Sequence, residues 1–455
     1  MEKTMSKVEI KKKKKQIKED ADFEKELQED AVDKNKVKEM LMSKMKKKES
    51  EMVELIQKQD RALNWFVVGC GQGGSRIAET FYDSGYESVV INTAEQDLTH
   101  IQVPTQNKLL LKYALDGAAK DISMGEDAFL TYQDEIDKFI QGKMPEDTNM
   151  IILSVTGGGG TGSGSVEPMI DILKTYQVPL IVLYVLPLQS DDVTSKNNSL
   201  ITLAKLAKYA KNDVISSLMV VDNAKIETLP YLKQGNFWSQ ANSVIVEPLH
   251  MFNMLSVCAS NYTSLDPMDT GKLLTTGDCC IYGQVEVEDY MEETALAEAV
   301  MESLESGLLA GGFDLTSARA AGIILLGSKD ILDELPAVNV NYAYAMINEV
   351  TNNATVYRGM YEAETDGKIK IFAIFSGLGL PESRIDALKL EAKERMKELT
   401  NKEEQRGTKM EMSFENDAVK TDIDKIHQKI KKKKSAFNKL ANTAMKGRLV
   451  DRRKR

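Results

Sequence analysis

Short runs of apolar residues alternate with amphipathic stretches through the first half of the chain. The apolar runs predict buried strands at residues 65–68, 88–91, 150–155, 180–185 and 217–221. Helical periodicity between these runs predicts helices such as 76–82, 166–176 and 198–211. Continuously apolar strands that alternate with helices are typical of a parallel sheet in an α/β fold. The pattern therefore predicts a parallel-sheet domain over residues 61–236.

The pattern changes after residue 236. Residues 237–262 have helical periodicity and predict a long central helix, which Pro248 should kink or split. The segments that follow predict a smaller α+β domain over residues 263–381. Its strands are expected at 279–287, 321–326, 354–363 and 368–375, and its helices near 292–309 and 339–349.

Both ends of the chain are strongly charged. Residues 1–60 contain no glycine or proline, and their apolar positions recur at spacings of four and seven, which predicts a charged helical extension. A charged C-terminal helix is expected over residues 382–406, followed by a polar linker and basic tail over residues 407–455.

The charge distribution singles out the tail. The chain has a formal net charge of −10, yet residues 426–455 contain twelve Lys or Arg and one acid, Asp451. The remaining residues therefore carry −21, the difference between −10 and +11. An acidic body with a basic tail predicts an anionic partner: DNA, a DNA-binding adaptor or the acidic surface of a neighbouring subunit. The alternative is a solvated tail that binds nothing.

Composition argues against several classes of protein. No apolar run is long enough to cross a bilayer and no charged-then-apolar leader opens the chain, so we expect a cytoplasmic protein without a membrane partner. The cysteines Cys70, Cys258, Cys279 and Cys280 lack metal-ligand spacing, and free thiols are expected. With three histidines in 455 residues, an imidazole-based catalytic or zinc site is not expected.

Two glycine-rich segments, Gly69–Gly74 and Gly157–Gly164, each follow an apolar strand and open a helix. Glycine lets backbone N–H groups approach phosphate oxygens closely, and the helix that follows adds the positive end of its dipole. Together the segments predict two walls around one polyphosphate. Flexible linkers are the alternative, but the apolar strand and amphipathic helix beside each segment argue against them.

Residues 69–74 also match the G-x-G-x-x-G pattern of dinucleotide-binding enzymes. Such enzymes place an acidic residue near the end of the second strand to hold the ribose, whereas this chain has Asn92 there. A nicotinamide-dependent dehydrogenase is therefore the weaker hypothesis, and an NAD-binding test would separate the two.

Residues 158–164 read G-G-G-T-G-S-G, which matches the signature of the tubulin/FtsZ superfamily. The other motifs follow in that family's order from residue 64 to residue 381, and their loops most resemble the TubZ-like branch carried by plasmids and phages. The resemblance implies a GTPase that polymerises into filaments, with GTP or GDP and Mg²⁺ as cofactors. It also implies that the parallel-sheet domain binds GTP and that the α+β domain is an activation domain.

The family resemblance implies specific contacts with the nucleotide. Gln72 would lie near the phosphates and metal, and Asp191 would accept a ribose hydroxyl. Asn223 would help to read guanine. Trp238 and Asn242, four residues apart on one helical face, would stack on the base and hydrogen-bond to it, unless Trp238 is a core residue. The full implied set is Gly71, Gln72, Gly73, Gly74, Ser75, Asn92, Thr93, Gly158, Gly159, Gly160, Thr161, Gly162, Ser163, Asp191, Asn223, Trp238 and Asn242.

Two further loops carry implied roles. Residues 116–124 occupy the position of the loop that senses the γ-phosphate, although they depart from the glycine-rich FtsZ version. Residues 265–274 resemble the catalytic loop, in its TubZ form, with Asp269 as the principal catalytic residue and Asp266 in support. In the family these acids act on the GTP of the adjacent subunit. The alternative is an ordinary acidic turn around Pro267.

Three biological roles fit this resemblance. The first is a filament that segregates or positions plasmid or phage DNA, and the TubZ-like loops favour it. The second is an FtsZ-like division protein, against which Ser264 counts because FtsZ has asparagine at that position. The third is a nucleotide-binding scaffold that hydrolyses little GTP.

Overall fold

A computed structural model describes residues 61–113, 116–229, 232–288, 290–291, 294–302 and 307–410. The predicted N-terminal extension and the basic tail 426–455 lie outside these residues. The chain divides into two units, residues 1–392 and 393–455. The sheet and the candidate site belong to the first unit.

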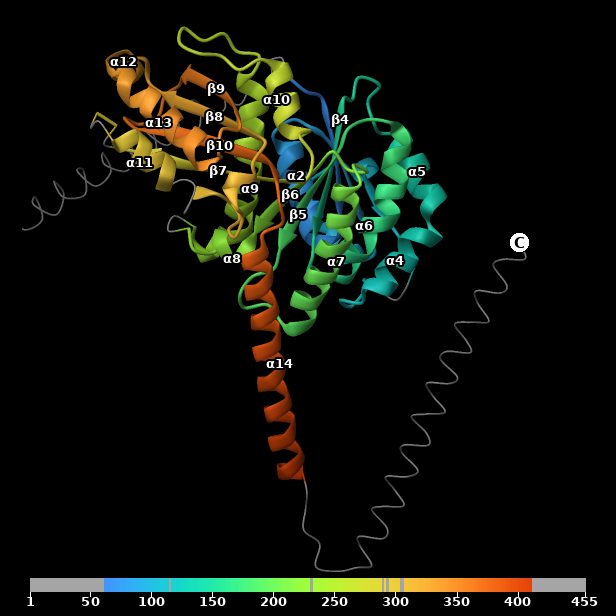
Figure 1. Cartoon of the computed structure of the whole chain (residues 1–455). Coiled ribbons are helices and arrows are strands. Elements are labelled where there is room, and N and C mark those ends of the chain that lie inside the picture. The colour runs from blue at the N-terminus through green and yellow to red at the C-terminus, as the bar shows by residue number, and fades with distance from the viewer. Residues whose placement is uncertain are drawn as a thin grey trace, which may run out of the picture. The chain divides into compact units, whose positions relative to one another are not determined.

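A sheet forms the centre of this unit (Figure 1). It has ten strands in the order β3-β2-β1-β4-β5-β6-β7-β10-β8-β9. Its first six strands pair in parallel. Their bounds are β1 Trp65–Cys70, β2 Glu87–Asn92, β3 Lys108–Leu110, β4 Met150–Thr156, β5 Leu180–Leu186 and β6 Ser217–Asp222. The predicted parallel α/β sheet is confirmed, and β3 is a strand that the sequence pattern did not predict.

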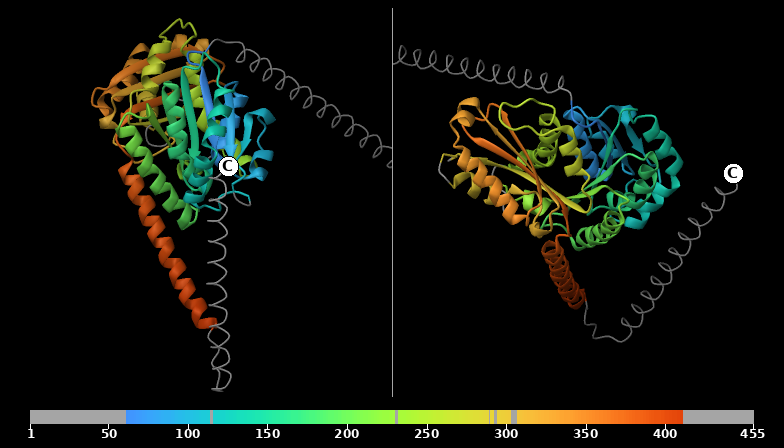
Figure 2. Two further views of the ribbon diagram at one scale, coloured as in Figure 1. Left: turned by 90° about the vertical axis from the view of Figure 1, so that its right-hand side faces the viewer. Right: turned by 45° about the horizontal axis from the view of Figure 1, so that its top comes forward.

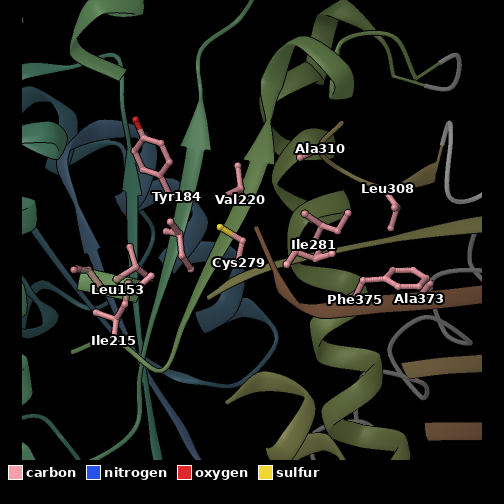
Figure 3. Close-up of a cluster of buried hydrophobic side chains, with 14 of the residues drawn as sticks. Leu153, Tyr184, Ile215, Val220, Cys279, Ile281, Leu308, Ala310, Ala373 and Phe375 are labelled. Carbon is pink, nitrogen blue, oxygen red and sulfur yellow. The ribbon is translucent and has the colours of Figure 1, made fainter. Parts of the chain in front are cut away.

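The apolar runs in these strands supply two hydrophobic cores, one on each face of the sheet. Successive side chains of a strand point to opposite faces. In β4, Leu153 and Val155 therefore join one cluster while Ile152 joins the other. Figure 3 shows the first cluster continuing from Leu153 to Phe375, so one core spans both halves of the sheet.

Helices of the first half connect these strands. The α-helices are α2 Gly71–Asp83, α3 Glu95–Thr99, α4 Ile122–Thr131, α5 Gln133–Gln141, α6 Gly160–Leu173, α7 Val193–Lys211 and α8 Asn223–Ile226. Short 3₁₀ turns lie at Thr105–Asn107, Lys174–Tyr176 and Gln234–Asn236. Buried residues of α2 join one hydrophobic cluster and those of α6 and α7 join the other, which places these helices on opposite faces of the sheet.

The central helix α9 runs from Phe237 to Leu255 and ends before residue 262. It continues through Pro248, so the expected split is wrong. A proline removes one helical hydrogen bond, but α9 is buried on both sides of it, at Val246 and Leu249. The helix packs against α2 in the first half and against β7 and β10 in the second (Figure 1; Figure 2).

The second half adds β7 Cys279–Val287, β8 Ala320–Gly327, β9 Thr355–Glu362 and β10 Ile369–Leu378 to the same sheet. Strand β7 pairs in parallel with β6, whereas β10 is antiparallel to both β7 and β8. The helices of this second half are α10 Pro267–Leu274, α11 Ala295–Glu302, α12 Lys329–Glu334 and α13 Ala337–Val350, with a 3₁₀ turn at Leu315–Ser317. The sequence pattern predicted neither α10 nor α12.

The last described helix, α14, spans Glu382–Met410. It extends four residues beyond the predicted end at residue 406. Among the described residues, no helix is both long enough and apolar enough to span a membrane.

Candidate functional site

The glycine-rich loops meet because β1 and β4 are neighbours in the sheet. Gly69 pairs with Ser154 and Cys70 with Val155, so the two strands end side by side. The strand order reverses between β1 and β4, with β2 on one side and β5 on the other. Such a switch point, at the carboxyl ends of parallel strands, is where α/β folds bind ligands.

Two glycines of the first loop allow this close approach. A Cβ on Gly74 would lie 2.2 Å from the carbonyl oxygen of Ser154, and one on Gly71 would lie 2.8 Å from the nitrogen of Gly162. Gly71 also has a φ of 71°, which favours glycine. These two glycines therefore pack the first loop against β4 and the second loop.

The second loop leads into α6, which begins at Gly160. A Cβ on Gly160 would lie 2.7 Å from the backbone of Asp121, so this glycine packs against the 116–124 segment. Gly159 has open space instead, and a Cβ at that position would meet no atom within 4 Å. The Ser163 hydroxyl donates to the carbonyl of Gly157 at 2.7 Å and holds the loop's curvature.

A cavity of about 450 Å³ opens between the loops, within the size range of small-molecule sites. Twelve of the seventeen implied nucleotide-binding residues line it: Gln72, Gly73, Asn92, Gly158, Gly159, Gly160, Thr161, Gly162, Asp191, Asn223, Trp238 and Asn242. The structure thus brings together residues from six segments spread between positions 72 and 242.

The other five implied residues do not line the cavity. They are buried behind its walls: Gly71, Gly74, Ser75, Thr93 and Ser163. Thr93 and Thr161 join two of the segments, because their hydroxyl oxygens lie 2.6 Å apart. The buried Ser75 hydroxyl has no hydrogen-bond partner among the described residues.

One side of the cavity carries a carboxylate that the sequence analysis did not single out. Asp97 accepts a hydrogen bond from Gln72 Nε2 at 2.7 Å and another from Asn92 Nδ2 at 3.2 Å. This network orients the side chains of the two implied phosphate-binding residues. All three residues line the cavity, and their side chains offer the oxygen donors that Mg²⁺ prefers.

Lys120 supplies positive charge to the cavity wall and was also missed. Its Nζ lies 2.6 Å from Asp192 Oδ2 and 3.0 Å from Ser195 Oγ. The hydrogen bond from Lys120 lowers the pKa of Asp192. Asp192 also caps α7, where it accepts from the backbone N–H of Ser195. The sequence could have indicated Lys120, because it is a lysine within segment 116–124, which was already assigned a place beside the phosphates.

The residues that the family resemblance assigns to the ribose and the base lie at other parts of the wall. Asp191 accepts a hydrogen bond from the backbone of Leu188 at 2.9 Å, which shapes the loop after β5. Asn223 begins α8, directly after β6. Trp238 is 43% exposed, so the alternative of a core tryptophan is wrong, whereas Asn242 is buried.

Asp266 and Asp269 do not line this cavity. Asp266 is the N-cap of α10 and Asp269 lies in its first turn, with Pro267 at the first helical position. Between them, Met268 is 68% exposed. Within the described part of the chain, no group of three or more His, Cys, Asp or Glu side chains is arranged to hold a metal ion.

Comparison with known proteins shows what this chain is similar to. Residues 64–229 match the model of the Tubulin/FtsZ family, GTPase domain. The tubulin-like protein TubZ of Bacillus thuringiensis subsp. israelensis is 24% identical over 429 residues, covering 83% of this chain and 85% of that protein. The tubulin-like protein CetZ of Pyrococcus furiosus is 25% identical over 325 residues, covering 69% and 84%.

Solved structures show the same fold. The GTPγS-form protofilament of TubZ from B. thuringiensis serovar israelensis has a TM-score of 0.67 at 21% identity, covering 78% of this chain and 96% of that chain. A structure described as type III plasmid segregation TubZ has a TM-score of 0.63 at 22% identity, covering 75% and 94%. Residues 64–229 therefore match the GTPase domain of the Tubulin/FtsZ family, and the chain is similar to TubZ over 83% of its length.

Proposed function

We propose that the protein binds GTP with Mg²⁺ in the cavity and polymerises into filaments that hydrolyse this GTP at subunit interfaces. One observation carries the proposal: the glycine-walled cavity and the Asp266–Asp269 pair belong to one chain, yet neither acid lines the cavity. A second copy of the chain must bring the acids to the nucleotide. The relatives solved as protofilaments and as a two-stranded filament support such an arrangement.

The cavity residues divide into three groups in this proposal. Gln72, Gly73 and the loop 158–162 hold the phosphates through backbone N–H groups and side chains. Asp191 accepts a ribose hydroxyl. Asn223 and Asn242 hydrogen-bond to guanine, and Trp238 stacks on it.

Mg²⁺ fits the phosphate-facing wall, where Gln72 and Asp97 are the groups that would hold it, directly or through water. When bound, it neutralises phosphate charge and stabilises the leaving oxygen. Asp269 of the adjacent subunit orients the attacking water and accepts its proton, with Asp266 beside it. Hydrolysis therefore begins when a second subunit joins.

The test is phosphate release from GTP over a range of protein concentrations, with light scattering recorded in parallel. We expect the activity per subunit to rise above a critical concentration, together with scattering. A specific activity that stays flat with concentration would mean that each chain carries a complete active site. GTP binding and scattering without turnover would favour the scaffold alternative.

For the biological role, we propose a cytoplasmic filament that moves plasmid or phage DNA. The relative described as a plasmid segregation TubZ supports this role, as do the twelve basic residues of segment 426–455. If that segment contacts phosphates, DNA affinity of the full chain should fall steeply with salt and show little sequence preference. A chain ending at residue 425 should lose this binding while retaining GTP turnover. Unchanged DNA affinity in the shortened chain would exclude the tail as the contact.

A further inference from the structure

Buried charges connect the first turns of α14 to the loops after β5 and β6. Arg384 lies on α14, and its Nε is 2.5 Å from Asp222 Oδ2 at the end of β6. Its Nη1 is 2.8 Å from Glu391 Oε1, two turns further along the helix. Glu391 in turn pairs with Lys196 of α7 at 2.8 Å, and Lys196 Nζ donates to the carbonyl of Gln189 at 2.8 Å.

These four charged side chains are largely withdrawn from water. Their exposed fractions are 4% for Asp222, 5% for Lys196, 13% for Arg384 and 22% for Glu391. Surface ion pairs contribute little to stability, but a buried charge whose partner is removed is strongly disfavoured. The four groups therefore constrain one another's positions, and through them the backbone segments that carry them.

Those backbone segments form one end of the nucleotide cavity. Asp222 precedes Asn223, and its Oδ1 accepts a hydrogen bond from the backbone of Ala224 at 3.1 Å, which caps α8. Lys196 follows Ser195, a cavity residue, and holds the loop that contains Asp191 through the carbonyl of Gln189. Arg384 itself does not line the cavity.

We propose that Arg384 is a positioning residue for the nucleotide. Acting with Glu391 and Lys196, it holds the guanine-facing and ribose-facing loops in the arrangement that binds GTP or GDP. This inference rests on the proposed nucleotide contacts. Because linkage is reciprocal, a bound nucleotide must stabilise the attachment of the first α14 turns by the same free energy with which that attachment favours binding.

The first test uses the full-length wild-type chain and hydrogen exchange. Backbone amides of residues 384–391 should exchange more slowly with saturating GDP than without it. Amides in β9, at the opposite end of the sheet from the cavity, provide the internal comparison and should not change. Unchanged exchange in residues 384–391 while GDP is bound would overturn the coupling. Failure of the wild-type chain to bind GDP at all would instead overturn the proposed function.

The second test compares two arginines of the same helix. Arg384→Gln should weaken GDP binding by about 10-fold or more, a common size for coupled sites, and should raise KM for GTP with kcat changed less. Arg395→Gln is the matched control. It removes an ion pair of similar length, because Arg395 Nη1 lies 2.7 Å from Glu398 Oε2, but both of these side chains are more than half exposed. It should leave GDP affinity unchanged. Arg384→Lys keeps a charge beside Asp222 and should recover part of the affinity.

If Arg384 only stabilises the fold and does not position the nucleotide-binding loops, a different result is expected. Arg384→Gln would then unfold at a lower temperature but bind GDP normally below that temperature, and this outcome would overturn the proposal. If Arg384→Gln does not fold, the double variant Asp222→Asn with Arg384→Met removes both charges and keeps an oxygen to cap α8. Weakened GDP binding by that folded double variant would support the proposal, and wild-type affinity would refute it.

Discussion

The side chains of Asp266 and Asp269 each accept a hydrogen bond from the other residue's backbone N–H, at the start of α10. The N–H of Asp269 donates to Asp266 Oδ1 at 2.8 Å, and the N–H of Asp266 donates to Asp269 Oδ2 at 3.4 Å. This reciprocal capping box fixes the first turn of α10. Both carboxylates are thus held at the start of α10, outside the cavity of their own chain, as the proposed contact with a neighbouring subunit requires.

A first prediction separates the capping role of Asp269 from its proposed catalytic role. Asp269→Asn keeps an oxygen for the capping bond but loses the carboxylate. GTP turnover should fall by about 100-fold or more, the usual contribution of a general base. GTP binding and sedimentable filaments should persist, and the filaments should disassemble more slowly because their GTP is retained.

The matched control is Asp366→Asn, which changes an exposed acid in the turn before β10 and should leave turnover unchanged. Asp269→Ala should resemble the asparagine variant in turnover and in addition lose the hydrogen bond that the Asp269 side chain accepts from the backbone N–H of Asp266. Normal phosphate release by Asp269→Asn would remove this residue from the catalytic mechanism.

A second prediction concerns Lys120. Lys120 lines the cavity and lies in segment 116–124, which the family resemblance implies would sense the γ-phosphate. Lys120→Met should weaken GTPγS binding by about 10-fold and GDP binding less, because one charge-assisted hydrogen bond contributes on the order of 1–3 kcal/mol. Equilibrium binding of both nucleotides measures the ratio. Lys112→Met, at an exposed lysine nearby, should change neither affinity, and equal losses for both nucleotides in Lys120→Met would contradict a γ-phosphate contact.

A third prediction uses two adjacent glycines. Gly160→Ala places a methyl group 2.7 Å from the backbone of Asp121, so the second loop and segment 116–124 must separate. Overpacking of this kind costs about 1–3 kcal/mol. Gly159→Ala meets no atom within 4 Å and should keep wild-type stability. Urea unfolding of both variants measures the difference, and equal stabilities would show that the loops accommodate the methyl group.

A fourth prediction concerns acid stability and His250. Burial, with a smaller contribution from Arg61, lowers the pKa of His250 from 6.5 to about 4. Between these two values the unfolded chain binds the proton and the folded chain does not. His250 therefore makes its full contribution to the free energy of unfolding above pH 6.5. This contribution is lost as the pH falls towards 4, so the protein should become less stable by about 3 kcal/mol in total.

The contribution of His250 is isolated by comparing pH profiles of variants. In His250→Gln the free energy of unfolding should differ less between pH 6.5 and pH 4.5 than in the wild type, because glutamine does not titrate. His100→Gln, at an exposed histidine, should retain the wild-type profile. An unchanged slope in His250→Gln would show that other groups cause the acid sensitivity.

Local sequence patterns were sufficient for much of the architecture. The apolar runs at 65–68 and 150–155 became β1 and β4 because a strand buried on both faces must be apolar throughout. The glycines between strand and helix predicted the position of the cavity, because the backbone packs too closely there to leave room for a Cβ. Pro248 did not split α9, because burial along the helix outweighed a local helix-breaking preference.

Tertiary structure alone decided which distant residues meet. Asp222 and Arg384 are 162 positions apart and pair only because β6 and the first turn of α14 are brought together. Lys120 became a cavity residue because segment 116–124 packs on Gly160. The sequence by itself determined most of the central strands, the glycine loops and the family resemblance, since these depend on local spacing. Contacts across the sheet depend on strand order, which no local pattern encodes.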